Sequence, residues 1–166
     1  MNREFAFPGT RPRWAPDRVV DIEHLALVLD VDPTARSVAG TATLRCRALA
    51  PETRSVELDA VELTIERVTV GGAPAGFRHD GKKLRIELPA PVAAGAELVV
   101  AVTYRGAPRR GLYFIAPDEA YPGKPVQVWS QGQDEDSRYW FPCIDTPNQK
   151  ATSEVTVTVP GSLFAL

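Results

Sequence analysis

The sequence predicts an all-β protein: a single antiparallel β-sandwich domain over residues 1–166. Apolar and polar residues alternate in several runs, with the period of a half-buried antiparallel strand. Clusters of turn-forming residues separate these runs, and the chain contains 15 prolines and 12 glycines. No stretch shows a 3.6-residue apolar stripe longer than two turns. These three observations together favour two packed sheets of about eight to ten strands.

The N-terminal half begins with an expected extension and continues with two strands. Residues 1–19 contain three prolines and no long apolar run, so we expect an extension without a secretory signal, and a cytoplasmic protein. The first strand is expected in residues 23–32, where one face carries Leu25, Leu27, Leu29 and Val31. The next is expected in residues 38–48, where one face carries Val38, Ala42, Leu44, Cys46 and Ala48.

Three further alternating runs lie at residues 83–88, 97–104 and 154–159. Asp80-Gly81 precedes the first of them and predicts a tight hairpin, because such turns demand a positive φ. The segments "GGAPAG", "PAPVAAG" and "APDEAYPGKP" are predicted turns. The last residues, "GSLFAL", are mostly apolar, whereas a chain end is normally polar, so we expect the natural chain to continue past Leu166.

Composition and charge limit the function classes. Hydrophobic residues make up 44% of the chain and charged residues 24%, and no apolar run approaches the length of a membrane span. The formal net charge of -2 provides no field that would attract nucleic acid or anionic lipid, so neither is an expected partner. Cys46 and Cys143 are expected to be buried free thiols.

The motifs of most hydrolase sites are missing from the sequence. It has no H-E-x-x-H, no C-x-x-C, no glycine-rich phosphate loop and no G-x-S-x-G. We therefore expect no catalytic residue and no metal site in this chain. The two histidines, His24 and His79, are most simply exposed polar residues, and a dyad of either with Cys143 has no support in the sequence.

A dense polar and aromatic segment follows residue 130. Asp134, Glu135 and Asp136 are interpreted as a solvated turn in which Asp134 or Asp136 caps backbone amides or pairs with Arg138. The triplet Tyr139-Trp140-Phe141 is expected to pack in the core, and Asp145 to be structural. Gln131 and Gln133, two residues apart on an extended segment, would point the same way, and their amide oxygens are good acceptors for an ammonium group.

Taken whole, the segment "SQGQDEDSRYWFPCIDTPNQKATSEVTVTVP" resembles the signature at the end of the N-terminal domain in peptidase family M1, the zinc metallopeptidases that include aminopeptidase N and leukotriene hydrolase. The resemblance rests on the Gln-x-Gln pair, the acidic turn before Arg138, the "FPC-x-D-x-P" core, Lys150 and the Val/Thr strand that ends at Pro160. "RRGLYF", at residues 109–114, is similar to the Gly-aromatic segment that precedes this region in the family.

The resemblance implies a saddle-shaped β-domain packed on a C-terminal helical catalytic domain, which binds zinc through H-E-x-x-H and a distant Glu. In such enzymes Gln133 sits where a Gln or Glu binds the free α-amine of a peptide, and Gln131 where a Gln lines the first specificity pocket. This chain alone would be inactive. Many aminopeptidases have Glu at the position of Gln133, whereas Gln is similar to the leukotriene hydrolase branch, so epoxide hydrolysis stays open. A stand-alone or inactive binding or scaffold module is the alternative.

Overall fold

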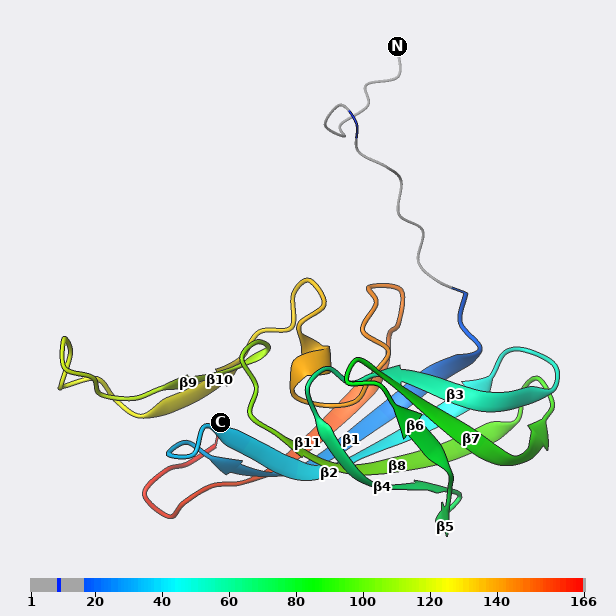
Figure 1. Ribbon diagram of the computed structural model, residues 1–166, viewed down its shortest axis with the longest axis horizontal. Helices are drawn as coiled ribbons and strands as arrows, with labels where there is room; N and C mark the ends of the chain where they lie inside the picture. Colours follow the sequence, from blue (N-terminus) through cyan, green and yellow to red (C-terminus); the bar gives the residue numbers. More distant parts are fainter. Residues whose placement is uncertain (1–8, 10–16, 166) are drawn as a thin grey trace.

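A computed structural model describes Gly9 and residues 17–165 (Figure 1). Most of the extension predicted at residues 1–19 therefore lies outside the described residues. Within the described part, the strands are β1 (Val20–Asp32), β2 (Ser37–Ala48), β3 (Thr53–Asp59), β4 (Thr64–Val70), β5 (Ala73–Pro74), β6 (Phe77–His79), β7 (Lys83–Val92), β8 (Glu97–Gly106), β9 (Leu112–Ile115), β10 (Gln127–Ser130) and β11 (Thr152–Thr158), with one 3-10 turn, η1 (Ser137–Tyr139).

The strands form three sheets. A six-stranded sheet has the order β11-β1-β2-β8-β4-β5, a three-stranded sheet the order β3-β7-β6, and β9 pairs with β10 alone. In Figure 1 the three-stranded sheet lies over one half of the six-stranded sheet, and the β9–β10 ribbon extends beyond the other half. The predicted fold class is confirmed. One pairing departs from it, since β11 joins β1 in parallel.

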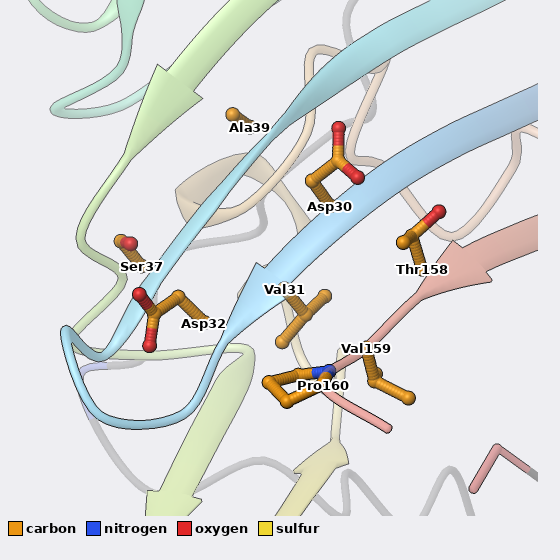
Figure 2. A pocket seen from close by; sticks show the side chains of 8 residues that line it. All are labelled: Asp30, Val31, Asp32, Ser37, Ala39, Thr158, Val159 and Pro160. Carbon is orange, nitrogen blue, oxygen red and sulfur yellow. The ribbon is translucent and has the colours of Figure 1, made fainter. Parts of the chain in front are cut away.

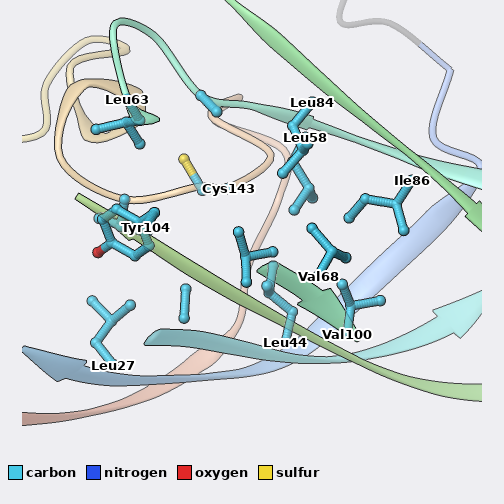
Figure 3. Packing of buried hydrophobic residues seen from close by; sticks show 14 of the residues in the cluster. Leu27, Leu44, Leu58, Leu63, Val68, Leu84, Ile86, Val100, Tyr104 and Cys143 are labelled. Atoms are coloured by element: carbon cyan, nitrogen blue, oxygen red, sulfur yellow. The ribbon is translucent and has the colours of Figure 1, made fainter. Parts of the chain in front are cut away.

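A single apolar core fills the space between the two larger sheets (Figure 3). Leu44 and Val100 contribute from the six-stranded sheet, while Leu58 and Ile86 contribute from the three-stranded sheet. Cys143 belongs to neither sheet. Its burial in the same cluster shows that the segment after β10 closes part of the sandwich.

A β-bulge explains why the buried face of β1 changes parity along the strand. Val20 and Ile22 are buried at even positions, whereas Leu27 and Leu29 are buried at odd positions. The register against β2 shifts between Ile22 and His24, and an extra residue in one strand moves the side chains that follow to the other face. The alternation predicted for residues 23–32 is correct, but the strand begins earlier, before the bulge.

The predicted turn "PAPVAAG" begins too early, because β7 continues through Pro89 and Pro91 to Val92. Proline removes a backbone donor and is tolerated where one side of a strand needs no partner. The short β6 pairs only with residues 84–86 of β7, and Thr53 of β3 pairs with Val92. Both prolines therefore lie where β7 has a neighbour on one side at most.

The last strand is present but less buried than its alternation predicts. Val155 pairs with Leu27, so both side chains point to the same face of the sheet. Leu27 is buried, but Val155 is 54% exposed, because β11 is the edge strand and the second layer does not reach over it.

Gly40 allows a close approach of β2 to β1. A Cβ atom at this position would lie 2.1 Å from the carbonyl oxygen of Val28. We expect Gly40→Ala to lower the free energy of unfolding by about 1–3 kcal/mol, the usual range for overpacking. Gly76→Ala is the matched control, since no atom lies within 4 Å of its Cβ position. Denaturant unfolding of both variants measures the difference, and equal midpoints would contradict the account.

No helix among the described residues is long and apolar enough to cross a membrane.

Candidate functional site

The candidate site is the elbow, defined as residues 131–150 between β10 and β11. It starts at the base of the β9–β10 ribbon, where the Gln131 N–H donates to the Gly111 carbonyl oxygen at 2.9 Å. Gly111 is buried and has a φ of 76°, a conformation that favours glycine. A Cβ atom there would lie 2.0 Å from the Asp136 carbonyl oxygen, so Gly111, which precedes β9, packs directly on the acidic turn of the elbow.

Gln131 and Gln133 are both exposed. The predicted extended segment ends at Gly132, and Gln133 begins a turn over residues 133–136. The two glutamines are nevertheless linked, because the Gln133 N–H donates to the Gln131 amide oxygen at 3.3 Å. Gly132 between them packs closely, since a Cβ atom on it would lie 2.5 Å from the Ser137 hydroxyl.

The three consecutive acids form a turn whose side chains diverge. Glu135 pairs with Arg138 at 2.6 Å, and Asp136 lies 3.4 Å from the Arg110 guanidinium. The solvated turn is thus correct, but the predicted pairing is wrong, because Arg138 pairs with Glu135, Asp145 and Asp59 and not with Asp134 or Asp136. The i,i+3 spacing across η1 brings Glu135 to Arg138. This arrangement has no point on which the three carboxylates converge.

Arg138 anchors the elbow to the three-stranded sheet. Its Nε atom donates to the Asp145 carboxylate at 3.1 Å, and its Nη2 atom donates to the Asp145 carbonyl oxygen at 2.9 Å. Its Nη1 atom lies 3.6 Å from the Asp59 carboxylate. Asp59 also receives the Asp145 N–H at 3.1 Å and lies 2.9 Å from the Lys83 ammonium. One guanidinium therefore joins the elbow to the end of β3.

Backbone bonds complete this attachment. Asp59 and Cys143 form an isolated antiparallel bridge, with N–H to O distances of 2.6 and 3.0 Å, and the Val61 N–H donates to the Arg138 carbonyl oxygen at 2.8 Å. Burial raises the pKa of the Asp145 carboxyl, although the hydrogen bonds from Arg138 act in the opposite direction. The structural role predicted for Asp145 agrees with these contacts.

The aromatic triplet packs as expected at its C-terminal end. Phe141 is buried, and Trp140 meets it edge-on with ring centroids 4.5 Å apart. Tyr139 is half-buried and carries the Arg110 guanidinium over its ring. The triplet therefore fastens the elbow to the core and leaves the two glutamines at its outer side.

Neither histidine reaches the elbow glutamines, and both are half-buried, not exposed as predicted. The His24 Nδ1 atom lies 2.8 Å from the Thr152 hydroxyl, and the His79 Nε2 atom lies 2.7 Å from the Ala60 carbonyl oxygen. These contacts give both rings structural partners within β1–β11 and beside β6.

One hollow lies at an end of the six-stranded sheet, and another lies beneath the elbow. The larger of these, about 400 Å³, lies where β1 and β11 end and β2 begins, away from the elbow (Figure 2). Two carboxylates line this hollow. Asp32 accepts hydrogen bonds from the N–H groups of Thr34 and Ala35, and Asp30 is exposed. The smaller one, about 190 Å³, lies beneath the elbow between Ile22 and Phe141 and is mostly apolar. The polar groups suited to recognise a substrate are instead on the elbow surface.

The prediction of two free, buried thiols is confirmed for Cys46 and Cys143. Burial raises the pKa of the Cys46 thiol to about 12 and that of Cys143 well above its usual range. Because the thiolate is the reactive form, we expect neither cysteine to react with a disulfide reagent in the native protein at pH 8. In denaturant both thiols should react with the reagent. Rapid labelling of either residue in the native protein would show that its surroundings open readily.

Asp59 is the residue that the sequence did not single out. Asp59 is the last residue of an alternating strand, where an exposed acid is common. No residue near it in the sequence indicates that the elbow folds over it. Among the described residues, no group of three His, Cys, Asp or Glu side chains could hold a metal ion.

The sequence model of the peptidase M1 N-terminal domain matches residues 21–166. Leukotriene A-4 hydrolase of Xenopus laevis is 34% identical over 160 residues, which cover 92% of this chain and 26% of that protein. Aminopeptidase B of Mus musculus is 32% identical over 173 residues, which cover 90% of this chain and 27% of that protein. The chain thus spans about a quarter of the length of these relatives.

A solved structure gives the same result for the fold. A two-domain M1 zinc metallopeptidase bound to L-arginine superposes with a TM-score of 0.72 at 25% identity. The match covers 88% of this chain and 34% of that one.

Proposed function

The chain belongs to the peptidase M1 family as its N-terminal domain, and on this premise we propose that it binds the free α-amino group of peptides for a zinc aminopeptidase. In this proposal residues 1–166 form one β-sandwich domain, and a catalytic domain follows in the same polypeptide. The intact protein removes N-terminal amino acids from peptides. A cytoplasmic location stays a prediction.

The observation that supports the proposal most is the placement of Gln133. Its amide is exposed at the outer side of the elbow, while Arg138, the Asp59–Cys143 bridge and Phe141 fix the elbow from inside. A side chain that positions a substrate must itself be fixed by well-packed residues, because a mobile side chain cannot hold the substrate in one place. The elbow has this construction.

The chemistry suits an ammonium group. The Gln133 amide oxygen can accept an N⁺–H donor, and a hydrogen bond to a charged group contributes roughly 1.5–3 kcal/mol. A neutral acceptor also avoids the desolvation that a second carboxylate would require. Gln131, whose own oxygen accepts the Gln133 N–H, orients this turn and in our proposal lines the pocket for the first side chain.

In this proposal zinc is bound by the second domain, because a relative of this chain is a two-domain M1 zinc metallopeptidase. When bound there, zinc would polarise the scissile carbonyl and activate water. The contribution of this chain is limited to holding the amine and forming part of the pocket wall. Residues 1–166 alone should therefore release no amino acid when zinc is added.

The natural polypeptide tests the proposal. Its reading frame past Leu166 should encode H-E-x-x-H and a further Glu about one helix later, and the purified protein should release N-terminal amino acids from peptides. A chelator should abolish this release, and added zinc should restore it. A polypeptide that lacks these ligands would overturn the proposal and would favour the binding or scaffold module.

A further inference from the structure

Two residues that precede β9, Arg110 and Gly111, contact both ends of a short segment of the elbow. We call this segment, residues 131–136, the glutamine turn. At its first end the Gln131 N–H donates to the Gly111 carbonyl oxygen at 2.9 Å. At its last end the Asp136 carbonyl oxygen lies so close to Gly111 that a Cβ atom there would be 2.0 Å away. The backbone before β9 therefore fixes where the turn begins and where it ends.

The Arg110 side chain adds a second attachment at the last end of the glutamine turn. Its guanidinium lies 3.4 Å from the Asp136 carboxylate, and its Cζ atom lies 5.9 Å from the centre of the Tyr139 ring, a distance at which a cation is attracted to the ring face. Arg138 reaches the same turn through Glu135 and also pairs with the end of β3. One cation thus holds the turn from the side of β9, and the other holds it from the side of the three-stranded sheet.

The middle of the glutamine turn is exposed. Gln133 and Asp134 both face solvent. The Gln133 N–H donates to the Gln131 amide oxygen at 3.3 Å, and the Asp136 N–H donates to the Gly132 carbonyl oxygen at 3.0 Å. These bonds join residues of the turn to one another, so they hold its shape but not its place on the domain. The place of Gln133 therefore depends on the contacts at the two ends.

We propose that Arg110 is a positioning residue for the amine anchor, because it keeps the glutamine turn where the Gln133 amide oxygen can accept a substrate ammonium. This role rests on the proposed function, which supplies the ammonium. A hydrogen bond is directional, so a turn that moves presents its acceptor correctly for a smaller part of the time. Arg110 does not contact the substrate in this role. Asp136 balances its charge, so the guanidinium does not repel the substrate ammonium.

Substrate selection tests the role in the full natural enzyme. Arg110→Met should lower kcat/KM roughly 3- to 30-fold on an anilide with a free α-amine, the equivalent of one exposed ion pair and one exposed cation–π contact. On the matched des-amino anilide the change should stay within about twofold, because that substrate has no ammonium to bind. Arg110→Lys keeps a cation beside Tyr139 and should lose less than Arg110→Met. Equal losses on both anilides would overturn the proposal, and so would a gain on the free amine, which would indicate repulsion.

Arg109→Met is the matched control. Arg109 is the preceding residue, its side chain is 72% exposed, and it pairs with Glu62 in the loop between β3 and β4. Its replacement should leave kcat/KM near the wild-type value on both anilides. A loss equal to that of Arg110→Met would contradict the proposal, because any lost cation before β9 would then have the same effect.

A double variant shows whether Arg110 acts through Gln133. In a Gln133→Ala background, Arg110→Met should cause no further loss on the free amine, because no amide is left to position. The two losses should therefore be far from additive. Additive losses would overturn the proposal by showing that Arg110 affects the reaction independently of Gln133.

Hydrogen exchange of the full natural polypeptide tests the attachment of the turn without a substrate. Peptides that cover residues 131–137 should exchange about threefold faster or more in Arg110→Met, because the turn opens more often. Faster exchange with unchanged kinetics in Gln133→Ala would support the attachment and reject the amine anchor. Wild-type exchange with an amine-dependent loss in Gln133→Ala would support the amine anchor and reject the role of Arg110.

Discussion

Replacing Arg138 by methionine should lower the free energy of unfolding by about 3–5 kcal/mol, the range for breaking a buried ion pair. The guanidinium lies between Asp59 and Asp145, both of which are buried carboxylates. Methionine fills part of the volume but leaves the two acids without their shared cation. Lys83 remains beside Asp59 but does not pair with Asp145.

Denaturant unfolding measures this loss, and its pH dependence identifies the cause. Burial raises the pKa of Asp145, and the variant removes the hydrogen bonds that oppose the rise. A raised folded-state pKa gives stability that is present at low pH and lost as pH increases. The difference between wild type and Arg138→Met should therefore shrink as the pH falls below about 5.

Arg105→Met is the control for a surface pair. Arg105 bonds Glu66 at 3.0 Å, and both side chains are exposed, so its replacement should change stability by about 0–1 kcal/mol. Equal effects of the two variants would mean that the buried cluster around Arg138 does not anchor the elbow.

In the full natural enzyme, Gln133→Ala should lower kcat/KM for peptides by roughly 10- to 150-fold, the equivalent of 1.5–3 kcal/mol. The variant loses the acceptor for the substrate ammonium. Its free energy of unfolding should stay close to wild type, because the side chain is exposed. Gln133→Glu should retain activity, since a carboxylate accepts the same donor.

Asn148→Ala provides a matched control for this variant. Asn148 is another exposed amide of the elbow, and its oxygen accepts the Thr146 hydroxyl at 2.7 Å. Its replacement should leave kcat/KM near the wild-type value. A similar loss in both variants would indicate a general distortion of the elbow and not a lost amine contact.

Local pattern predicted β1, β2, β7, β8 and β11, but it did not predict which strands lie beside one another. The alternation in residues 97–104 and the Asp80-Gly81 turn are determined by side chains close in sequence, and β8 and the β6–β7 hairpin follow from them. The parallel pairing of β11 with β1 joins residues more than 120 positions apart, which no local signal encodes. The bulge in β1 was missed because it breaks the alternation that identifies a strand.

The same limit applies to the site. Gln131 and Gln133 stand out because two amides in an acidic and aromatic segment are unusual. Their support was only partly predictable: Asp145 could be assigned a structural role, but its partner Asp59 lies 86 residues earlier on β3. Contacts between residues so far apart in the sequence depend on how the sheets pack. Asp59 therefore looks like an exposed acid in the sequence, and it is buried only because the elbow folds over it.

The proposed role of Gln133 is to bind the substrate amine. The most direct test compares wild type and Gln133→Ala on two matched anilides, one with a free α-amine and one in which hydrogen replaces that amine. The account predicts that the variant loses kcat/KM roughly 10- to 150-fold on the free amine and less than about twofold on the des-amino analogue. Equal losses on both substrates would contradict it, because Gln133 would then act without contacting the amine.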